Sequence, residues 1–232
     1  MKLVIWGPTE VGKSSLTSHL SDLLSIPKIK SYNAEHKLSF VDFQPTSSNI
    51  SLDSYILKGL VDAQIDENNL SNFLSTFDND VKHLLVYRKN LLAHFLSWHH
   101  IEAKYNNEQY NYKFKVDELN VLECKNFIDE IKKSLEITHK TLKGNVQFLC
   151  AITYEQLFFE EDSVDIINNF FNTNISKEEW NRIQKTPKNK IHRKLDMTPD
   201  MKFVLDNDIE KYNYKENFDI LKDMFIDEQL IL

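Results

Sequence analysis

The chain is poor in glycine, cysteine and long apolar runs, and the last two shortages each argue against a class of protein. Of 232 residues only 4 are glycine and 2 are cysteine. Cys124 and Cys150 are too few for a disulfide framework, and they lack metal-ligand spacing. No stretch approaches the roughly 18–20 apolar residues of a membrane span, and Leu3–Trp6 is too short for a signal peptide. We therefore expect a cytoplasmic protein without a metal site.

An excess of positive charge is also missing. The formal net charge is −7, which argues against nucleic acid as a partner, so any anionic ligand must meet local positive charge. The hydrophobic content of 41% and the 15 phenylalanines predict a folded globule. The length suits one domain over residues 1–232 with helical or loop insertions at about 52–77 and 104–142, and it leaves the oligomeric state open.

Two of the four glycines lie in one motif behind the first apolar run. Gly7-Pro8-Thr9-Glu10-Val11-Gly12-Lys13-Ser14-Ser15 matches the G-x-x-x-x-G-K-S phosphate-binding loop, or P-loop. The backbone N–H groups of such a loop, with a helix dipole behind them, bind phosphate. We expect phosphate contacts from Gly7, Thr9, Glu10, Val11, Gly12, Lys13, Ser14 and Ser15.

Short apolar runs alternate with segments of helical periodicity along the chain. We predict strands at Lys2–Trp6, Leu38–Phe43, His83–Tyr87 and Val146–Ile152, and helices at about 14–24, 52–77, 90–105, 118–142, 165–171, 177–183 and 217–225. This alternation predicts an α/β, P-loop-type three-layer fold with a parallel central sheet flanked by helices. In such folds ligands bind at the carboxyl ends of the strands.

A second candidate anion site follows the predicted strand His83–Tyr87. Arg88 comes at the end of this strand, and Ser97 lies nine residues later on the next predicted helix. A guanidinium is a forked, charged donor and a hydroxyl is a second donor. The pair can therefore hold one phosphate from two sides.

These two segments resemble the cofactor-binding motifs of sulfotransferases, which use 3′-phosphoadenosine 5′-phosphosulfate (PAPS). Bacterial members often read R-x-N/D-x-x-x-x-x-x-S, as Arg88 to Ser97 does here. The glycine loop is similar to the G-P-x-K-x-G-T-T loop of heparan-type enzymes, and Thr153–Leu157 resembles their strand-end Y-E-x-L. The resemblance implies sulfuryl transfer from PAPS to a hydroxyl or amine of a small molecule or sugar, without magnesium.

The loop departs from the sulfotransferase pattern in the position of its lysine. The family's lysine precedes the glycine by two residues, where this chain has Glu10, whereas Lys13 follows Gly12 as in kinases. In a sulfotransferase Lys13 would act on the bridging oxygen from this shifted position. The complete G-x-x-x-x-G-K-S pattern leaves open a nucleoside or nucleotide kinase that uses ATP with magnesium, or a non-catalytic nucleotide-binding protein.

A base for the acceptor hydroxyl has three candidates. Heparan-type enzymes place a glutamate between the first helix and the second strand, which implies Glu35 here, while Asp42 and His36 remain alternatives. The family also has a late loop that covers the 3′-phosphate, and the basic residues Lys190 and Arg193 occupy that position. The partner implied by the resemblance is a small-molecule or saccharide acceptor.

Overall fold

The described residues form two compact units. The computed structural model describes residues 1–9, 11–26, 54–61, 65–106, 121–160, 162–185, 215–225 and 227–232. Backbone proximity groups Met1–Tyr87, Lys133–Gln184 and Leu232 into a first unit, and Arg88–Lys132 with Lys185–Ile231 into a second. The first unit contains the glycine loop, and the second contains Arg88 and Ser97.

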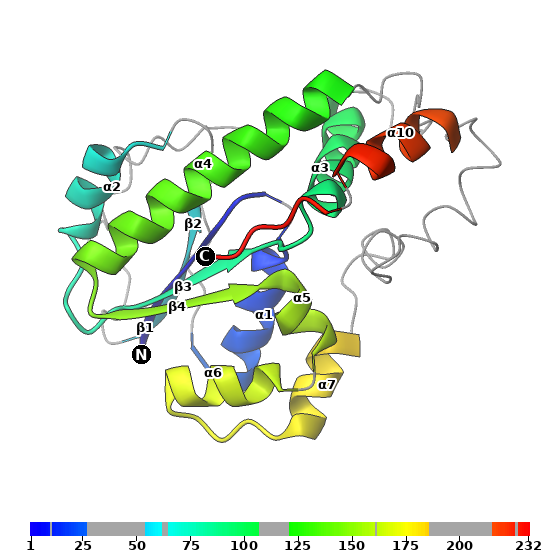
Figure 1. Ribbon diagram of the computed structural model, residues 1–232. Helices are drawn as coiled ribbons and strands as arrows, with labels where there is room; N and C mark the ends of the chain where they lie inside the picture. Colours follow the sequence, from blue (N-terminus) through cyan, green and yellow to red (C-terminus); the bar gives the residue numbers. More distant parts are fainter. Residues whose placement is uncertain are drawn as a thin grey trace. The chain divides into compact units, whose positions relative to one another are not determined.

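A parallel sheet organises the first unit (Figure 1). In chain order the described elements of the molecule are β1 (Lys2–Gly7), α1 (Lys13–Leu24), β2 (Tyr55–Leu60), α2 (Glu67–Leu74), β3 (Lys82–Tyr87), α3 (Leu91–Asn106), α4 (Val121–Asn145), β4 (Phe148–Thr153), α5 (Tyr154–Phe159), α6 (Ser163–Phe171), α7 (Lys177–Lys185) and α10 (Lys215–Phe225). The four strands lie in the order β2-β1-β3-β4, and every pair is parallel. The fold is therefore α/β with helices flanking a parallel sheet, as the sequence predicted.

One face of the sheet packs against α1, α5, α6 and α7 (Figure 1). Alternate strand residues point to this side, since successive side chains of a strand face opposite ways. Trp180 of α7 is buried there, and its indole N–H donates to the Ser163 hydroxyl at 2.6 Å. The apolar members of this core include Leu3, Ile5, Leu16, Leu20, Ile56, Leu84, Val86, Ile152 and Ile167.

The opposite face of the sheet is covered by α2 and by the part of α4 that belongs to the first unit (Figure 1). Trp6 of β1 is fully buried on this side, edge-on to Phe73 of α2 at a centroid distance of 6.0 Å. Its indole N–H donates to Nδ1 of His83 at 3.0 Å. Burial lowers the pKa of His83 to about 4, so the imidazole is neutral and can accept this bond.

The structure corrects one predicted element. We expected a helical segment at about 52–77, but Tyr55–Leu60 is a strand and the helix is confined to Glu67–Leu74. The apolar run at the start of β2 pairs residue by residue with β1, and this pairing decides its conformation. The helix begins only after Asp66, whose carboxylate accepts a hydrogen bond from the Asn69 N–H.

The other predicted strands and helices that fall on described residues are confirmed within a few residues. The structure has strands at Lys2–Gly7, Lys82–Tyr87 and Phe148–Thr153 and helices at Lys13–Leu24, Leu91–Asn106, Val121–Asn145, Ser163–Phe171, Lys177–Lys185 and Lys215–Phe225. The predicted strand Leu38–Phe43 lies outside the described residues.

The second unit is helical in its described part, with α3, the first half of α4 and α10. Phe127 of α4 packs against Phe95 of α3 at a ring-centroid distance of 5.6 Å. The segment after α10 returns to the start of α3, where the Leu91 N–H donates to the Glu228 carbonyl at 3.3 Å. The Leu230 N–H donates to the Lys89 carbonyl at 3.1 Å, so this end of the chain is tied to the residues around Arg88.

Candidate functional site

The glycine loop connects β1 to α1 in the first unit. Gly12 is the N-cap of α1 with φ 76° and ψ 8°, a left-handed conformation that glycine adopts without strain. No side chain caps the first turn at this position. Since the first N–H groups of a helix have no acceptor within the helix, this turn presents donors where a phosphate can bind.

Close packing explains why both positions of the motif are glycine. A Cβ atom on Gly7 would lie 2.2 Å from the backbone oxygen of Val86 on β3, and one on Gly12 would lie 2.8 Å from the ring of Phe158. Real Cβ atoms do not approach other atoms this closely. Val11, between them, is fully buried in the core and anchors the loop.

The segment after β4 packs against the glycine loop at Gly12. Thr153 caps α5 in a capping box: its hydroxyl accepts from the Gln156 N–H, and the Gln156 side chain accepts from the Thr153 N–H, each at 3.0 Å. This cap directs Tyr154 and Phe158 toward Gly12. The two rings contact each other at a centroid distance of 4.7 Å. The Y-E-x-L segment therefore packs against the glycine loop.

Two lysines bring positive charge to this loop. The ammonium of Lys13 donates to the carbonyl of Pro8, which places it over the loop backbone. Lys58 of β2 lies with its Nζ 3.4 Å from the hydroxyl oxygen of Ser14, at the long end of hydrogen bonding. Ser14 is exposed and Ser15 is half-buried, so the Ser14 hydroxyl faces solvent beside Lys58.

Sequence reasoning missed Lys58. The helix expected at 52–77 gave no reason to place this lysine beside the glycine loop. A signal was present: Ile56 and Lys58 share one strand face, and Ile56 packs in the core beneath α1. A lysine near the carboxyl end of this strand, on the sheet face that α1 covers, therefore lies beside the glycine loop.

The structure brings Arg88 and Ser97 together in the second unit. Arg88 follows the last residue of β3, and Ser97 lies on α3; both side chains are buried. A nitrogen of the guanidinium lies 3.4 Å from the Ser97 hydroxyl oxygen. Asn90 starts α3 by accepting a hydrogen bond from the Ala93 N–H at 2.9 Å, and Ser97 lies about two turns further along this helix. The two side chains thus lie together, and their role in holding a phosphate stays a prediction.

Other predicted site residues lie outside the described part of the chain. These are Glu10 of the loop, the candidate bases Glu35, His36 and Asp42, and the late basic residues Lys190 and Arg193. Their roles stay predictions.

The described thiols and histidines do not form a metal site. Among the residues that the structure describes, no group of three or more histidine, cysteine or acidic side chains is placed to hold a metal ion. Burial raises the pKa of Cys124 to about 12 and that of Cys150 to about 11, so both stay protonated. His94 is fully buried, edge-on to Phe127 at a centroid distance of 5.2 Å.

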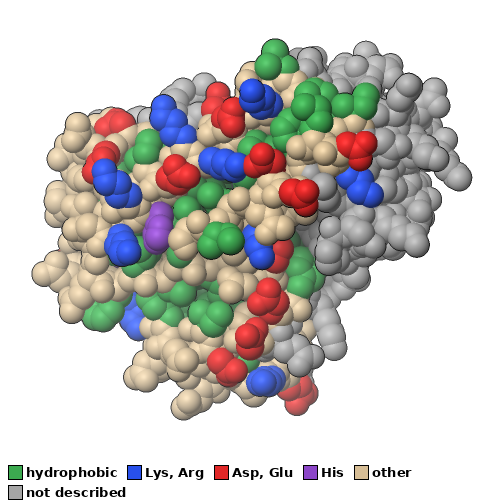
Figure 2. Space-filling model, viewed as in Figure 1, with side chains coloured by type: hydrophobic (Ala, Val, Ile, Leu, Met, Phe, Trp, Pro, Cys, Tyr) green, Lys and Arg blue, Asp and Glu red, His purple; other side chains and the backbone are tan. Residues whose placement is uncertain are grey.

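The described surface carries charges of both signs. On the face shown in Figure 2, lysine and arginine side chains are interspersed with acidic ones, in keeping with the net charge of −7. Within the described ranges, every helix is too short or too polar to cross a bilayer.

Comparison with known proteins defines the fold further. A sulfotransferase domain from the curacin biosynthetic pathway matches this chain with a TM-score of 0.51 and 13% sequence identity, and the match covers 96% of each chain. No protein-family model matches the chain, and no curated protein gives a significant match. At this level of identity the likeness concerns the fold alone: the chain has a sulfotransferase-like α/β fold.

Proposed function

We propose that this chain is a sulfotransferase that transfers a sulfuryl group from PAPS to a hydroxyl or amine of a small molecule or sugar. The observation that carries the proposal is the loop between β1 and α1, where an uncapped helix start and two ammonium groups provide positive potential. The likeness of the whole fold to a sulfotransferase domain supports it.

The loop residues fit the 5′ end of such a cofactor. Sulfuryl transfer requires stabilisation of charge on the leaving 5′-phosphate, which a set of fixed donors provides. The N–H groups from Thr9 to Ser15 and the ammonium of Lys13 would bind this phosphate. Lys58, beside Ser14, would add the charge that the family's loop lysine supplies from the position of Glu10.

The Arg88–Ser97 pair fits the 3′-phosphate of the same cofactor. Its guanidinium is a charged, forked donor whose geometry matches the oxygens of a phosphate. The Ser97 hydroxyl at 3.4 Å supplies a second donor. Glu35, Asp42 or His36 would accept the proton of the acceptor, and Lys190 and Arg193 would contact the 3′-phosphate.

A kinase is the second candidate function. The observation that favours it is the position of Lys13 directly after Gly12, which completes the P-loop pattern of enzymes that use ATP with magnesium. In those enzymes the hydroxyl that follows the lysine holds the magnesium ion, and Ser14 occupies this position with an exposed side chain.

Heat stabilisation by ligands separates the two functions. A ligand that binds only the folded chain raises its unfolding temperature. We expect adenosine 3′,5′-bisphosphate to stabilise the full-length chain without magnesium, and ATP with magnesium to do so less. Lys13→Met should abolish the stabilisation, whereas Lys140→Met, on the outer surface of α4, should preserve it.

Other outcomes have clear meanings. Stabilisation by ATP with magnesium, and none by the bisphosphate, would replace the sulfotransferase by the kinase. Stabilisation by the bisphosphate without sulfuryl transfer to any of a broad panel of alcohols, amines and sugars would indicate a non-catalytic nucleotide-binding protein.

A further inference from the structure

The connection between β3 and α3 carries Arg88 and is very short. β3 ends at Tyr87 and α3 begins at Leu91, so residues 88–90 form the whole connection. These residues lie between the ladder of the sheet and the hydrogen bonds of the helix. The position of the Arg88 guanidinium therefore depends on what else holds this part of the backbone.

Residues 227–232, the bridging segment, come after α10 and pair with this connection. The Leu230 N–H donates to the Lys89 carbonyl at 3.1 Å. In the other direction, the Leu91 N–H donates to the Glu228 carbonyl at 3.3 Å. Two reciprocal bonds of this kind are the pattern of an antiparallel pair. The bridging segment thus holds the connection as one side of a short antiparallel ladder.

The same pair fixes where α3 starts. Asn90 lies within the pair, and its side chain accepts a hydrogen bond from the Ala93 N–H at 2.9 Å. The Leu91 N–H belongs to the first turn, whose N–H groups find no acceptor inside a helix, and the Glu228 carbonyl supplies one. The first turn of α3 is therefore held from both sides, and Ser97 lies about two turns further along.

The bridging segment is itself anchored in the second unit. The side chain of Leu230 is buried. The carboxylate of Glu228 pairs with the ammonium of Lys132 on α4, and the Glu228 N–H donates to the Phe225 carbonyl at the end of α10 at 3.1 Å. A buried side chain, an ion pair and a backbone bond thus fix the segment that in turn holds the Arg88 connection.

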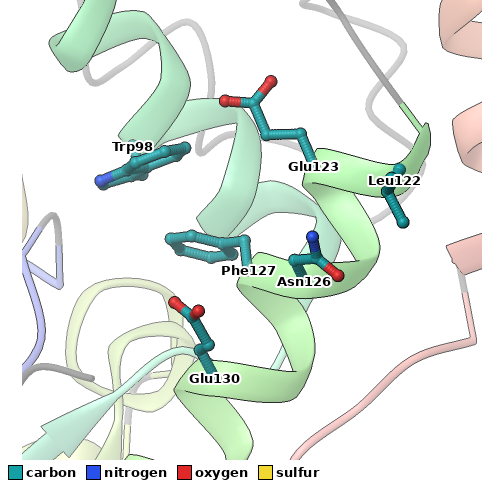
Figure 3. A pocket seen from close by; sticks show the side chains of 6 residues that line it. All are labelled: Trp98, Leu122, Glu123, Asn126, Phe127 and Glu130. Atoms are coloured by element: carbon teal, nitrogen blue, oxygen red, sulfur yellow. The ribbon is translucent and has the colours of Figure 1, made fainter. Parts of the chain in front are cut away.

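Packing on α4 holds α3 further along its length. Figure 3 shows the rings of Phe127 and Trp98 beside each other in the lining of a small pocket. Their centroids are 4.9 Å apart, and Phe127 also contacts the ring of Phe95 at 5.6 Å. Ser97 lies between these two residues of α3 in the sequence. The ring packing fixes the middle of α3 and the bridging segment fixes its start, so together they set where Ser97 lies relative to Arg88.

We propose that the bridging segment positions Arg88 and Ser97 for a phosphate, and that it thereby sets the preference of the chain for nucleotides with a 3′-phosphate. This inference rests on the proposed function, in which this pair binds the 3′-phosphate. Donors that are held in place before the ligand arrives bind it without the cost of ordering them. The Leu230 N–H acts through Lys89, next to Arg88, so it is a positioning group and not a ligand of the phosphate.

Calorimetry with two nucleotides tests this positioning. Leu230→Pro removes the N–H that bonds to Lys89, whereas Leu230→Ala shortens the buried side chain and keeps the N–H. We expect Leu230→Pro to lower the ratio of the affinities for adenosine 3′,5′-bisphosphate and adenosine 5′-monophosphate at least about threefold, because displaced donors lose part of their charge-assisted hydrogen bonds. Leu230→Ala should keep the ratio of the parent. So should Ile231→Pro, which places the same ring at a residue that is 79% exposed.

Hydrogen exchange in the parent chain gives a second test that needs no substitution. Coupling between a ligand and the segment that positions its site is reciprocal. The bisphosphate should therefore slow the exchange of the Leu91 and Leu230 amides, measured by NMR, at least about threefold more than the monophosphate does. This measurement decides the question even if Leu230→Pro fails to fold by circular dichroism.

The outcomes separate this inference from the proposed function. An unchanged affinity ratio in folded Leu230→Pro, an equal fall of the ratio in Leu230→Ala, or equal protection of the two amides by both nucleotides would overturn the inference and leave the proposed function standing. A parent chain that binds both nucleotides with equal affinity would overturn the proposed role of Arg88 and Ser97, and this inference with it.

Discussion

Replacement of Lys58 by methionine tests the positive charge that the structure places beside the loop. The Lys58 Nζ lies 3.4 Å from the Ser14 hydroxyl oxygen. A phosphate that accepts a hydrogen bond from Ser14 would therefore lie about 5 Å from this ammonium, given hydrogen bonds of about 2.7 Å. Methionine keeps the length of the side chain and removes only the charge, so the loop can keep its structure.

The size of the effect follows from Coulomb's law. Two unit charges about 5 Å apart attract by about 3 kcal/mol at an effective dielectric constant near 20. Lys58 is partly exposed, and solvent reduces the net value, so we expect a loss of about 1–2 kcal/mol on Lys58→Met. This corresponds to about 5- to 30-fold weaker binding of adenosine 3′,5′-bisphosphate.

Isothermal titration calorimetry without magnesium measures this loss. Lys2→Met is the matched control, because Lys2 lies at the amino end of β1, whereas the glycine loop follows its carboxyl end, and it pairs with Asp78 and Asp80 at 2.6 and 3.2 Å. Its removal should leave the affinity unchanged. If Lys58→Met binds the bisphosphate as tightly as the parent does, while Lys13→Met binds it weakly, Lys58 has no role in phosphate binding. Equal losses of affinity for Lys58→Met and Lys2→Met would indicate that the bisphosphate responds to the net charge of the protein and not to the position of Lys58.

Three further results are expected. Gly12→Ala should lower the unfolding free energy by about 1–3 kcal/mol, because a Cβ strains a left-handed residue and would lie 2.8 Å from Phe158. Gly144→Ala is the control and should not destabilise the chain, because nothing lies within 4 Å of its Cβ. A loss of stability for both variants in chemical denaturation would contradict the prediction. The pKa of His83 is lower in the folded chain, so the unfolded chain binds a proton at this residue more readily. The contribution of His83 to the unfolding free energy is therefore complete above pH 6.5 and should fall by about 3 kcal/mol as the pH drops to about 4. The unfolding free energy of the parent should fall by this amount relative to that of His83→Gln, and a constant difference between the two would refute the prediction. Cys124, which is fully buried and has a raised thiol pKa, should react with iodoacetamide only after unfolding, as mass spectrometry of pulse-labelled chain can show; rapid labelling of Cys124 in the native chain would contradict its burial.

The glycine loop could be predicted from the sequence because its signals are local. The strand, both glycines and the apolar face of α1 lie within the first 24 residues. The Arg88–Ser97 proximity was predictable for a similar reason, since a strand end and the next helix separate them by nine residues. In both cases the backbone geometry of adjacent elements fixes where the side chains lie.

Distant pairing could not be predicted in this way. The conformation of Tyr55–Leu60 depends on its partner strand β1, more than 50 residues earlier in the chain, and with this strand the sequence prediction also missed Lys58. The Trp6–His83 hydrogen bond joins residues 77 positions apart. This bond holds the fully buried indole of Trp6 in the core.

The central claim is that the glycine loop binds the 5′-phosphate of a nucleotide and that Arg88 and Ser97 bind its 3′-phosphate. The difference in affinity between two nucleotides, with and without a 3′-phosphate, tests this claim most directly. We expect the parent chain to bind adenosine 3′,5′-bisphosphate more tightly than adenosine 5′-monophosphate in calorimetry. Arg88→Ala, checked for folding by circular dichroism, should lose about 1.5–3 kcal/mol of affinity for the bisphosphate and almost none for the monophosphate. Ser97→Ala, which removes one hydroxyl, should lose about 0.5–1.5 kcal/mol in the same selective way. Equal losses for both ligands, or no preference in the parent chain, would contradict the claim.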